Sequence, residues 1–200
     1  MSQPANYLRV KRSQKFLREA LIDLIEEQGF DALTVGEIAE RAMVSRATFY
    51  RIYQDKYDLV EQIYAEATQM LFNSVSESGT EHPPQMWDRF FEHIAEYERL
   101  YRALLGRKGS PWFVMKMRAS LVELVKGYEQ HPSLQRAAQA REPLLSDYVR
   151  DIIATMMVET ITWWLEKGRP YTPKEMAWRC ASLASAIFTE TNAWQSSSSQ

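Results

Sequence analysis

The chain has 200 residues, of which 46% are hydrophobic and 25% are charged, and its formal net charge is −2. This composition is typical of a globular protein with enough residues for one or two small domains whose cores need no disulfide. A net charge so close to zero excludes a general electrostatic attraction to nucleic acid.

Positive charge is concentrated in two segments near the start of the chain. Residues 9–18 hold five basic side chains and no acidic one, and residues 41–56 hold four basic side chains against Asp55 alone. Any argument for DNA binding therefore depends on local charge and not on the overall balance.

Cysteine content and hydropathy indicate the compartment. The lone Cys180 excludes an internal disulfide, which suits a reducing environment. The N-terminus has no apolar segment behind its charges, and no apolar run approaches the roughly 20 residues that span a bilayer. We therefore expect a soluble, cytoplasmic protein.

The first predicted elements are a helix and two shorter helices. Apolar residues follow helical spacing within 11–28, and Gly29 is placed for a left-handed C-terminal cap. Thr34 and Glu37 have the spacing of a capping box, which predicts a helix over 34–41. Ser45 can cap a third helix, over 46–53. A short helix, a tight turn and a second short helix are the architecture of a helix-turn-helix.

The rest of the chain is also predicted to be helical. Asp55 can cap a longer helix over 56–73, and the proline-containing segment 74–85 is predicted to be a loop. No run of alternating apolar and polar residues indicates a strand, so we expect an all-α fold. Thr172 and Glu175 have the spacing of a second capping box. The further predicted helices cover 86–105, 111–127, 133–141, 143–167 and 173–193.

The third helix carries the candidate DNA-binding residues. In a helix-turn-helix this element enters the major groove N-terminus first. Phe49 and Ile52 are spaced to face the core, which leaves Arg46 free for a bidentate guanine contact, worth about 1–3 kcal/mol of discrimination. The alternative is an ordinary amphipathic helix with a solvated, charged back. The residues expected at DNA are Thr34, Ser45, Arg46, Ala47, Thr48, Tyr50, Arg51, Tyr53 and Lys56.

The segment LREALIDLIEEQGFDALTVGEIAERAMVSRATFYRIYQDKYDL, residues 17–59, resembles the N-terminal domain of the TetR family of transcriptional regulators. The resemblance places Thr34 and Lys56 where the family touches the phosphate backbone. It places Arg46, Ala47 and Tyr50 where the family contacts bases and phosphates.

Two positions depart from the family pattern. Met43 stands where the family usually has Gly or Asn in the turn, and a non-glycine residue with positive φ is uncommon. Ile52 stands where many members carry His, so one backbone contact is lost. The helix-turn-helix is still expected, but a relative's operator cannot be copied directly.

The resemblance implies a division of the chain. A three-helix helix-turn-helix DNA-binding domain is expected over 1–55, followed by a helical-bundle effector and dimerisation domain over 56–194. The serine-rich residues 195–200 are predicted to be a disordered tail.

The last two long helices are the predicted dimer interface. The helix over 143–167 has one narrow polar stripe on an otherwise apolar surface, which predicts burial on two sides, against its own domain and against a partner. Family members pair these helices as a four-helix bundle, which implies a homodimer on a near-palindromic operator. The expected interface residues are Ile153, Met157, Ile161, Trp164, Ala181, Ala184 and Phe188.

Aromatic and methionine residues of the second domain have two interpretations. They are either an ordinary hydrophobic core or, as the resemblance implies, the walls of a pocket for a small apolar or aromatic effector. The segments 101–113 and 163–176 also resemble activators of dihydroxyacetone kinase operons, which leaves open a protein partner and an activating role. The candidate pocket residues are Trp87, Phe91, Tyr101, Trp112, Met115, Tyr148 and Met156.

No chemistry of an enzyme is indicated. His82, His93 and His131 have no metal-ligand spacing among themselves or with Cys180, and the seven glycines form no phosphate-binding loop. We expect no cofactor, no bound metal and no catalytic residues. The two hypotheses that remain are an effector-responsive DNA-binding dimer and a DNA-binding dimer that acts through a protein partner.

Overall fold

The computed structural model describes residues 3–65, 83–129 and 143–197, and within these ranges the chain forms helices joined by turns, with no strand. The described residues form two compact units. The first holds 3–65 with 99–110, and the second holds 83–98, 111–129 and 143–197. The predicted all-α fold is confirmed.

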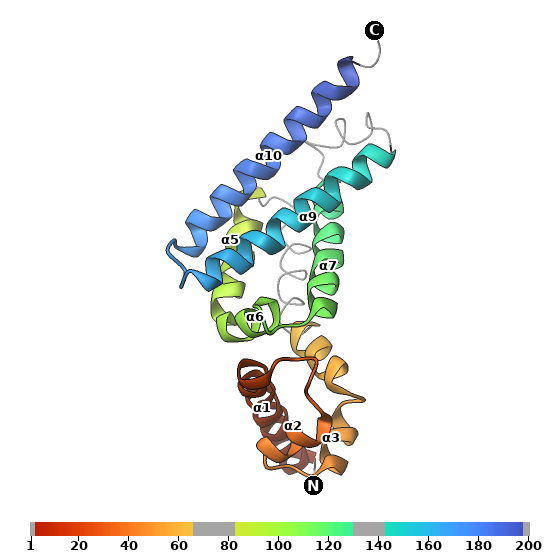
Figure 1. The fold of residues 1–200 in the computed structure, drawn as a ribbon, viewed down its shortest axis with the longest axis vertical. Helices are drawn as coiled ribbons and strands as arrows, with labels where there is room; N and C mark the ends of the chain where they lie inside the picture. Colours follow the sequence, from red (N-terminus) through yellow and green to blue (C-terminus); the bar gives the residue numbers. More distant parts are fainter. Residues whose placement is uncertain (1–2, 66–82, 130–142, 198–200) are drawn as a thin grey trace. The chain divides into compact units, whose positions relative to one another are not determined.

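The first unit begins with three helices that pack on one another (Figure 1). They are α1 (Gln3–Gln28), α2 (Val35–Arg41) and α3 (Arg46–Ile52). The helix predicted over 11–28 thus starts at Gln3, because nothing in the preceding residues breaks it. Residues 56–65 are helical as predicted, and the rest of the helix predicted over 56–73 lies outside the described residues.

The core of the first unit is apolar and fully buried. Leu17, Leu21 and Ile25 of α1 are spaced one helical turn apart and meet Ile38 of α2 and Phe49 of α3 in the interior. Gly29 ends α1 with a φ of 89°, and its N–H donates to the Ile25 carbonyl at 2.9 Å, as the predicted left-handed cap requires.

The loop between α1 and α2 is held by Lys56. The ammonium group donates to the carbonyl oxygens of Phe30 (2.9 Å), Asp31 (3.0 Å) and Leu33 (3.0 Å). It also lies 4.8 Å from the centroid of the Phe30 ring. Burial lowers the pKa of Lys56, and Asp31 and Asp55 oppose that shift. An ammonium has three N–H groups, so all of its donors are used inside the fold.

The second unit pairs α10 with α5 and α9 with α7 (Figure 1). These helices are α5 (Pro83–Glu96), α7 (Pro111–Glu129), α9 (Pro143–Glu166) and α10 (Pro173–Ser197). Trp164 of α9 is fully buried, its ring lies 5.5 Å from that of Phe91, and its Nε1–H donates to the Tyr171 carbonyl at 2.9 Å.

Several boundaries differ from those predicted. The helix expected over 86–105 is two helices, α5 and α6 (Glu98–Leu105), which are separated at Tyr97 by a turn that no local sequence signal marks. Helix α5 begins inside the predicted loop 74–85, most of which lies outside the described residues, as does the helix predicted over 133–141.

The C-terminal helix is longer than predicted. Helix α10 begins at Pro173, directly after the cap residue Thr172, and the predicted capping box is present: the Thr172 N–H donates to Glu175 Oε2 at 2.8 Å. It continues to Ser197, and therefore into the segment 195–200 that was predicted to be disordered. In the three described ranges, no helix has the length and apolarity required to cross a membrane.

The Lys56 contacts generate a stability prediction. Lys56→Met keeps the aliphatic stem and leaves three loop carbonyls without their donor. We expect it to lower the free energy of unfolding by about 2–4 kcal/mol, since hydrogen bonds to charged groups contribute about 1.5–3 kcal/mol and do not add fully. Urea titration followed by circular dichroism measures the change. Lys15→Met, at an exposed position of α1, is the control, and equal losses for both variants would contradict the role given to Lys56.

Candidate nucleic-acid interface

The helix-turn-helix is fixed by two caps and one unusual turn. The Thr34 N–H donates to Glu37 Oε2 at 2.8 Å, and the Glu37 N–H donates back to the Thr34 hydroxyl at 3.3 Å, so the predicted capping box is present. The hydrogen bonds from the side chain and backbone of Thr34 lower the pKa of Glu37. Ser45 caps α3 by accepting from the Thr48 N–H at 3.1 Å.

Met43 occupies the turn in the left-handed conformation. Its φ is 54°, the Met43 N–H donates to the Glu40 carbonyl and the Val44 N–H donates to the Ala39 carbonyl. The structure thus requires positive φ at the position where the family pattern has Gly or Asn. The Met43 side chain is 91% exposed, so it extends from the turn into solvent.

Helix α3 has a core face and a solvent face. Phe49 is fully buried with its ring 5.6 Å from that of Tyr53, and Ile52 is half-buried. Arg46, Ala47, Tyr50 and Arg51 are exposed, so four of the expected DNA residues lie on one accessible surface. They form the surface that a major groove would meet if α3 entered it.

Arg46 lies against α2, where Gly36 leaves room for it. A β-carbon placed on Gly36 would lie 3.0 Å from Arg46 Cζ and closer still to Nη2, so no side chain larger than hydrogen fits unless the guanidinium moves. The sequence analysis did not single out Gly36. The signal was a glycine inside a helix, which costs up to about 1 kcal/mol relative to alanine and so calls for a reason.

Tyr53 and Lys56 lie differently from what was expected. Tyr53 is only 4% exposed, so its ring belongs to the core and not to the surface of α3. Lys56 uses its three donors on loop carbonyls, and a phosphate contact would require at least one of them to be given up. Thr34, Ser45 and Thr48 lie near the surface, and their hydroxyls take part in the caps. A phosphate contact from Thr34 or Ser45 stays a prediction.

Acidic residues in the second half of α1 are paired within the unit. Arg41 binds both carboxylate oxygens of Glu27 at 2.7 Å, which lowers the pKa of Glu27. Arg99 bridges Asp23 and Glu26. Arg41 and Arg99, which lie outside α1, thus pair with the acidic residues in the second half of α1. The first half of α1 keeps its five basic residues with no acid in sequence between them.

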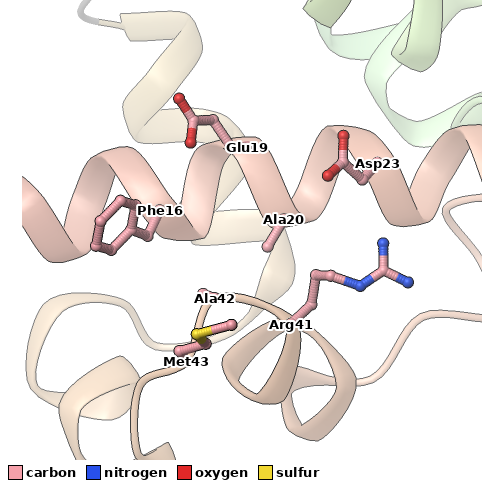
Figure 2. A pocket seen from close by; sticks show the side chains of 7 residues that line it. All are labelled: Phe16, Glu19, Ala20, Asp23, Arg41, Ala42 and Met43. Carbon is pink, nitrogen blue, oxygen red and sulfur yellow. The ribbon is translucent and has the colours of Figure 1, made fainter.

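A surface pocket of about 240 Å³ separates α1 from the end of α2 (Figure 2). Phe16 and Ala20 line it from α1, and Ala42 and Met43 line it from the turn. Glu19, Asp23 and Arg41 complete the lining. The pocket shows at which level of α1 the turn lies, beside Phe16 and Ala20.

The seven candidate pocket residues differ in burial and are divided between the two units. Trp87 and Phe91 are buried in the second unit, whereas Met115 and Tyr148 are more than half exposed. Trp112 and Met156 are half-buried, and Tyr101 belongs to the first unit, where its ring lies 6.4 Å from that of Tyr64. Helical periodicity alone did not reveal which unit each aromatic residue joins.

The candidate dimer residues of α9 are inside the protomer. Ile153, Met157, Ile161 and Trp164 are fully buried in the isolated chain, Ala184 is buried, and Ala181 and Phe188 are half-buried. The reason is that α9 packs on both α7 and α10, which cover its most apolar face. The four α9 residues therefore have no exposed surface to give to an interface, which corrects the prediction for them. The role of Ala181 and Phe188 at an interface stays a prediction. Nowhere in the described part of the chain do three His, Cys, Asp or Glu side chains meet in an arrangement that could hold a metal ion.

Comparison with known protein families assigns both parts of the chain. Residues 17–63 match the family described as bacterial regulatory proteins, tetR family, and residues 81–186 match a transcriptional regulator C-terminal region. The second match alone covers more than half of the chain.

Two relatives in Bacillus subtilis (strain 168) are HTH-type transcriptional regulators without a characterised role. YxbF is 33% identical over 70 residues, which are 33% of this chain and 18% of YxbF. YdeS is 50% identical over 44 residues, 22% of each chain. The matches span about a fifth of the length of these relatives.

Solved structures share the fold at low identity. A TetR transcriptional regulator from Streptococcus agalactiae 2603V gives a TM-score of 0.62 at 18% identity, over 90% of this chain and 97% of its own. The dihydroxyacetone kinase operon activator DhaS gives 0.59 at 16%, over 88% and 96%. Thermus thermophilus FadR, solved with lauroyl-CoA, gives 0.52 at 16%, over 86% and 92%. Together with the two family matches, the capped helices and the exposed face of α3, these likenesses show that the chain belongs to the TetR family of bacterial transcriptional regulators.

Proposed function

We propose that the protein acts in the cytoplasm as a homodimer that binds a near-palindromic DNA operator through α3 and regulates transcription there. The observation that carries the proposal is the solvent face of α3, where Arg46, Ala47, Tyr50 and Arg51 are exposed behind the Ser45 cap. In a two-fold dimer, two such helices would address half-sites about 34–36 Å apart.

The proposed effector acts on the second unit. A small apolar or aromatic molecule bound in the second unit would change the affinity for DNA by a reciprocal coupling energy, commonly about 1–3 kcal/mol. The likeness to FadR, solved with lauroyl-CoA, supports this kind of control. The likeness to the activator DhaS supports the alternative, in which a protein partner acts on the second unit and the regulator activates. Melting curves with and without acyl-CoA would separate the two, because a ligand that binds only the folded state raises the melting temperature.

We propose a dimer surface built on other residues of α9 than the four predicted, because those four are fully buried in the isolated chain. Tyr148, Ile152 and Trp163 are exposed on α9 at spacings of four and eleven residues, which places them on one face. Leu183 and Trp194 are exposed on α10 at a spacing of eleven residues. We propose these two stripes as the surface that pairs with a second copy of the chain.

Arg46 provides the first test. Operator fragments selected from genomic DNA would be titrated with wild type and Arg46→Ala by fluorescence anisotropy. Loss of a bidentate base contact should weaken operator binding by about 5- to 150-fold, while binding to unrelated duplex changes little. Arg107→Ala removes an exposed arginine between α6 and α7 and serves as the control. If Arg46→Ala keeps the wild-type ratio of operator binding to unrelated binding, the placement of α3 in the major groove is wrong.

Gly36 provides the second test. Gly36→Ala should leave thermal stability equal or higher, because alanine favours a helix over glycine by up to about 1 kcal/mol. The added methyl group must displace the Arg46 guanidinium, so we expect a reduced operator preference. In the Arg46→Ala background the same substitution should have no further effect on binding. An additive loss in the double variant would show that Gly36 acts otherwise.

The dimer surface provides the third test. Leu183 is 52% exposed and lies on the α10 stripe, whereas Trp178 is 69% exposed and lies off it. Leu183→Glu places a charge in the proposed interface and should shift the protein toward monomer at micromolar concentration, measured by sedimentation equilibrium. Trp178→Glu should remain dimeric. A reversed pattern, or a wild type that is monomeric, would refute the interface.

A further inference from the structure

The first half of α1 carries basic side chains that the fold does not use. Arg9, Lys11 and Arg12, here called the N-terminal cations, are exposed, and no carboxylate among the described residues pairs with any of them. Lys15 differs, since it lies 3.9 Å from Glu19. These three charges lie within about one helical turn, and Arg9 and Arg12, three residues apart, are neighbours on the helix surface. Like charges at such a spacing are unfavourable unless a counter-charge relieves them.

We propose that the N-terminal cations bind the phosphate backbone of DNA beside the groove that α3 enters, so that α1 is a second DNA-contacting element. The proposal rests on the proposed function, because it requires α3 to be the helix in the major groove. It adds a contact that the helix-turn-helix itself does not make.

Contacts within the first unit locate these cations. Near its start, α2 meets the end of α1, where Gln28 Nε2 donates to Glu37 Oε1 at 3.3 Å. The turn that ends α2 lies farther back along α1, because Met43 lines the same pocket as Phe16 (Figure 2). From its start to the turn at its end, α2 therefore runs along α1 in the direction of the N-terminus of α1.

Helix geometry extends this direction to the cations. Arg12 and Arg9 precede Phe16 by four and seven residues and so share its face. At a rise of 1.5 Å per residue, they lie about 6 Å and about 10 Å beyond Phe16 along the axis. They therefore project past the turn, and α3 begins three residues after Met43. A major groove is about 12 Å wide, so phosphates border any helix that enters it and come within reach of the extended side chains.

The chemistry of the segment fits a polyanion. Tyr7 is exposed with its ring 5.6 Å from the Lys11 ammonium, which offers a phenolic donor beside the cations. Acids of α1 appear only from Glu19 onward, and Asp23, Glu26 and Glu27 are bridged by Arg99 and Arg41. The start of α1 thus carries cations and no acidic side chain of its own before Glu19. Phosphate contacts of this kind add affinity without sequence preference.

The test removes the three charges together. Arg9→Gln/Lys11→Gln/Arg12→Gln should weaken binding to the operator and to unrelated duplex by the same factor, about tenfold or more at low salt. Between about 50 and 200 mM salt, the plot of log affinity against log salt should become shallower by about 0.9 for each lost phosphate contact. The ratio of operator to unrelated binding should stay constant.

Two control variants separate position from charge. Arg107→Gln/Lys167→Gln/Lys174→Gln removes three exposed cations elsewhere and should leave the salt slope unchanged. Arg9→Lys/Arg12→Lys keeps the charge and should keep the slope. The proposal is wrong if Arg107→Gln/Lys167→Gln/Lys174→Gln reduces the salt slope as much as the N-terminal substitutions do. It is also wrong if the N-terminal variant has unchanged helicity by circular dichroism and keeps the wild-type slope and affinity.

Arg46→Ala, measured in parallel, separates the role of α1 from the placement of α3 in the groove. Loss of operator preference in Arg46→Ala with no effect of the N-terminal substitutions would refute only the role of α1. No effect of either set would refute the placement of α3 as well.

Discussion

The first unit depends on one ammonium group. Lys56 comes after the helix-turn-helix in the chain, and its three hydrogen bonds go to carbonyls of the loop that precedes it. The contact therefore closes the three helices into a ring of interactions, with α1 on one side and the helical segment 56–65 on the other. Helix α3 lies between these two ends in the chain, so a residue outside the helix-turn-helix holds together the segments on either side of it.

Local signals in the sequence predicted most of this unit. The capping residues Thr34 and Ser45 and the glycine after α1 depend on interactions within a few residues, and each is present in the structure. The positive φ of Met43 follows the family pattern, which usually has Gly or Asn there, and no signal of the methionine itself. Residues whose placement depends on tertiary packing were harder to assign. Tyr53 has the spacing of a surface residue of α3 but packs on Phe49, and Lys56 finds its partners more than 20 residues earlier.

In the second unit, too, the sequence pattern did not reveal which helices pack on one another. The narrow polar stripe of α9 predicted burial against its own domain on one side and a partner on the other. The structure shows α9 packed on α7 and α10 of its own chain, because periodicity does not say which neighbour covers which face. Ile153 and Met157 could equally have faced a second subunit or the helices of their own chain, and the structure places them inside the protomer. The apolar residues left for an interface are Ile152 and Trp163, one position away from the predicted ones, a rotation of about 100° on a helix.

The distribution of charge along α1 also bears on how fast the protein finds DNA. With a formal net charge of −2, the molecule as a whole is weakly repelled by a duplex at a distance. Within about 8 Å, the screening length at physiological salt, the duplex instead interacts with the local charge, so that it attracts a cationic helix end and repels acidic surfaces. Helix α1 would therefore steer the molecule electrostatically during the encounter, so that α3 faces the groove more often and the association rate constant rises.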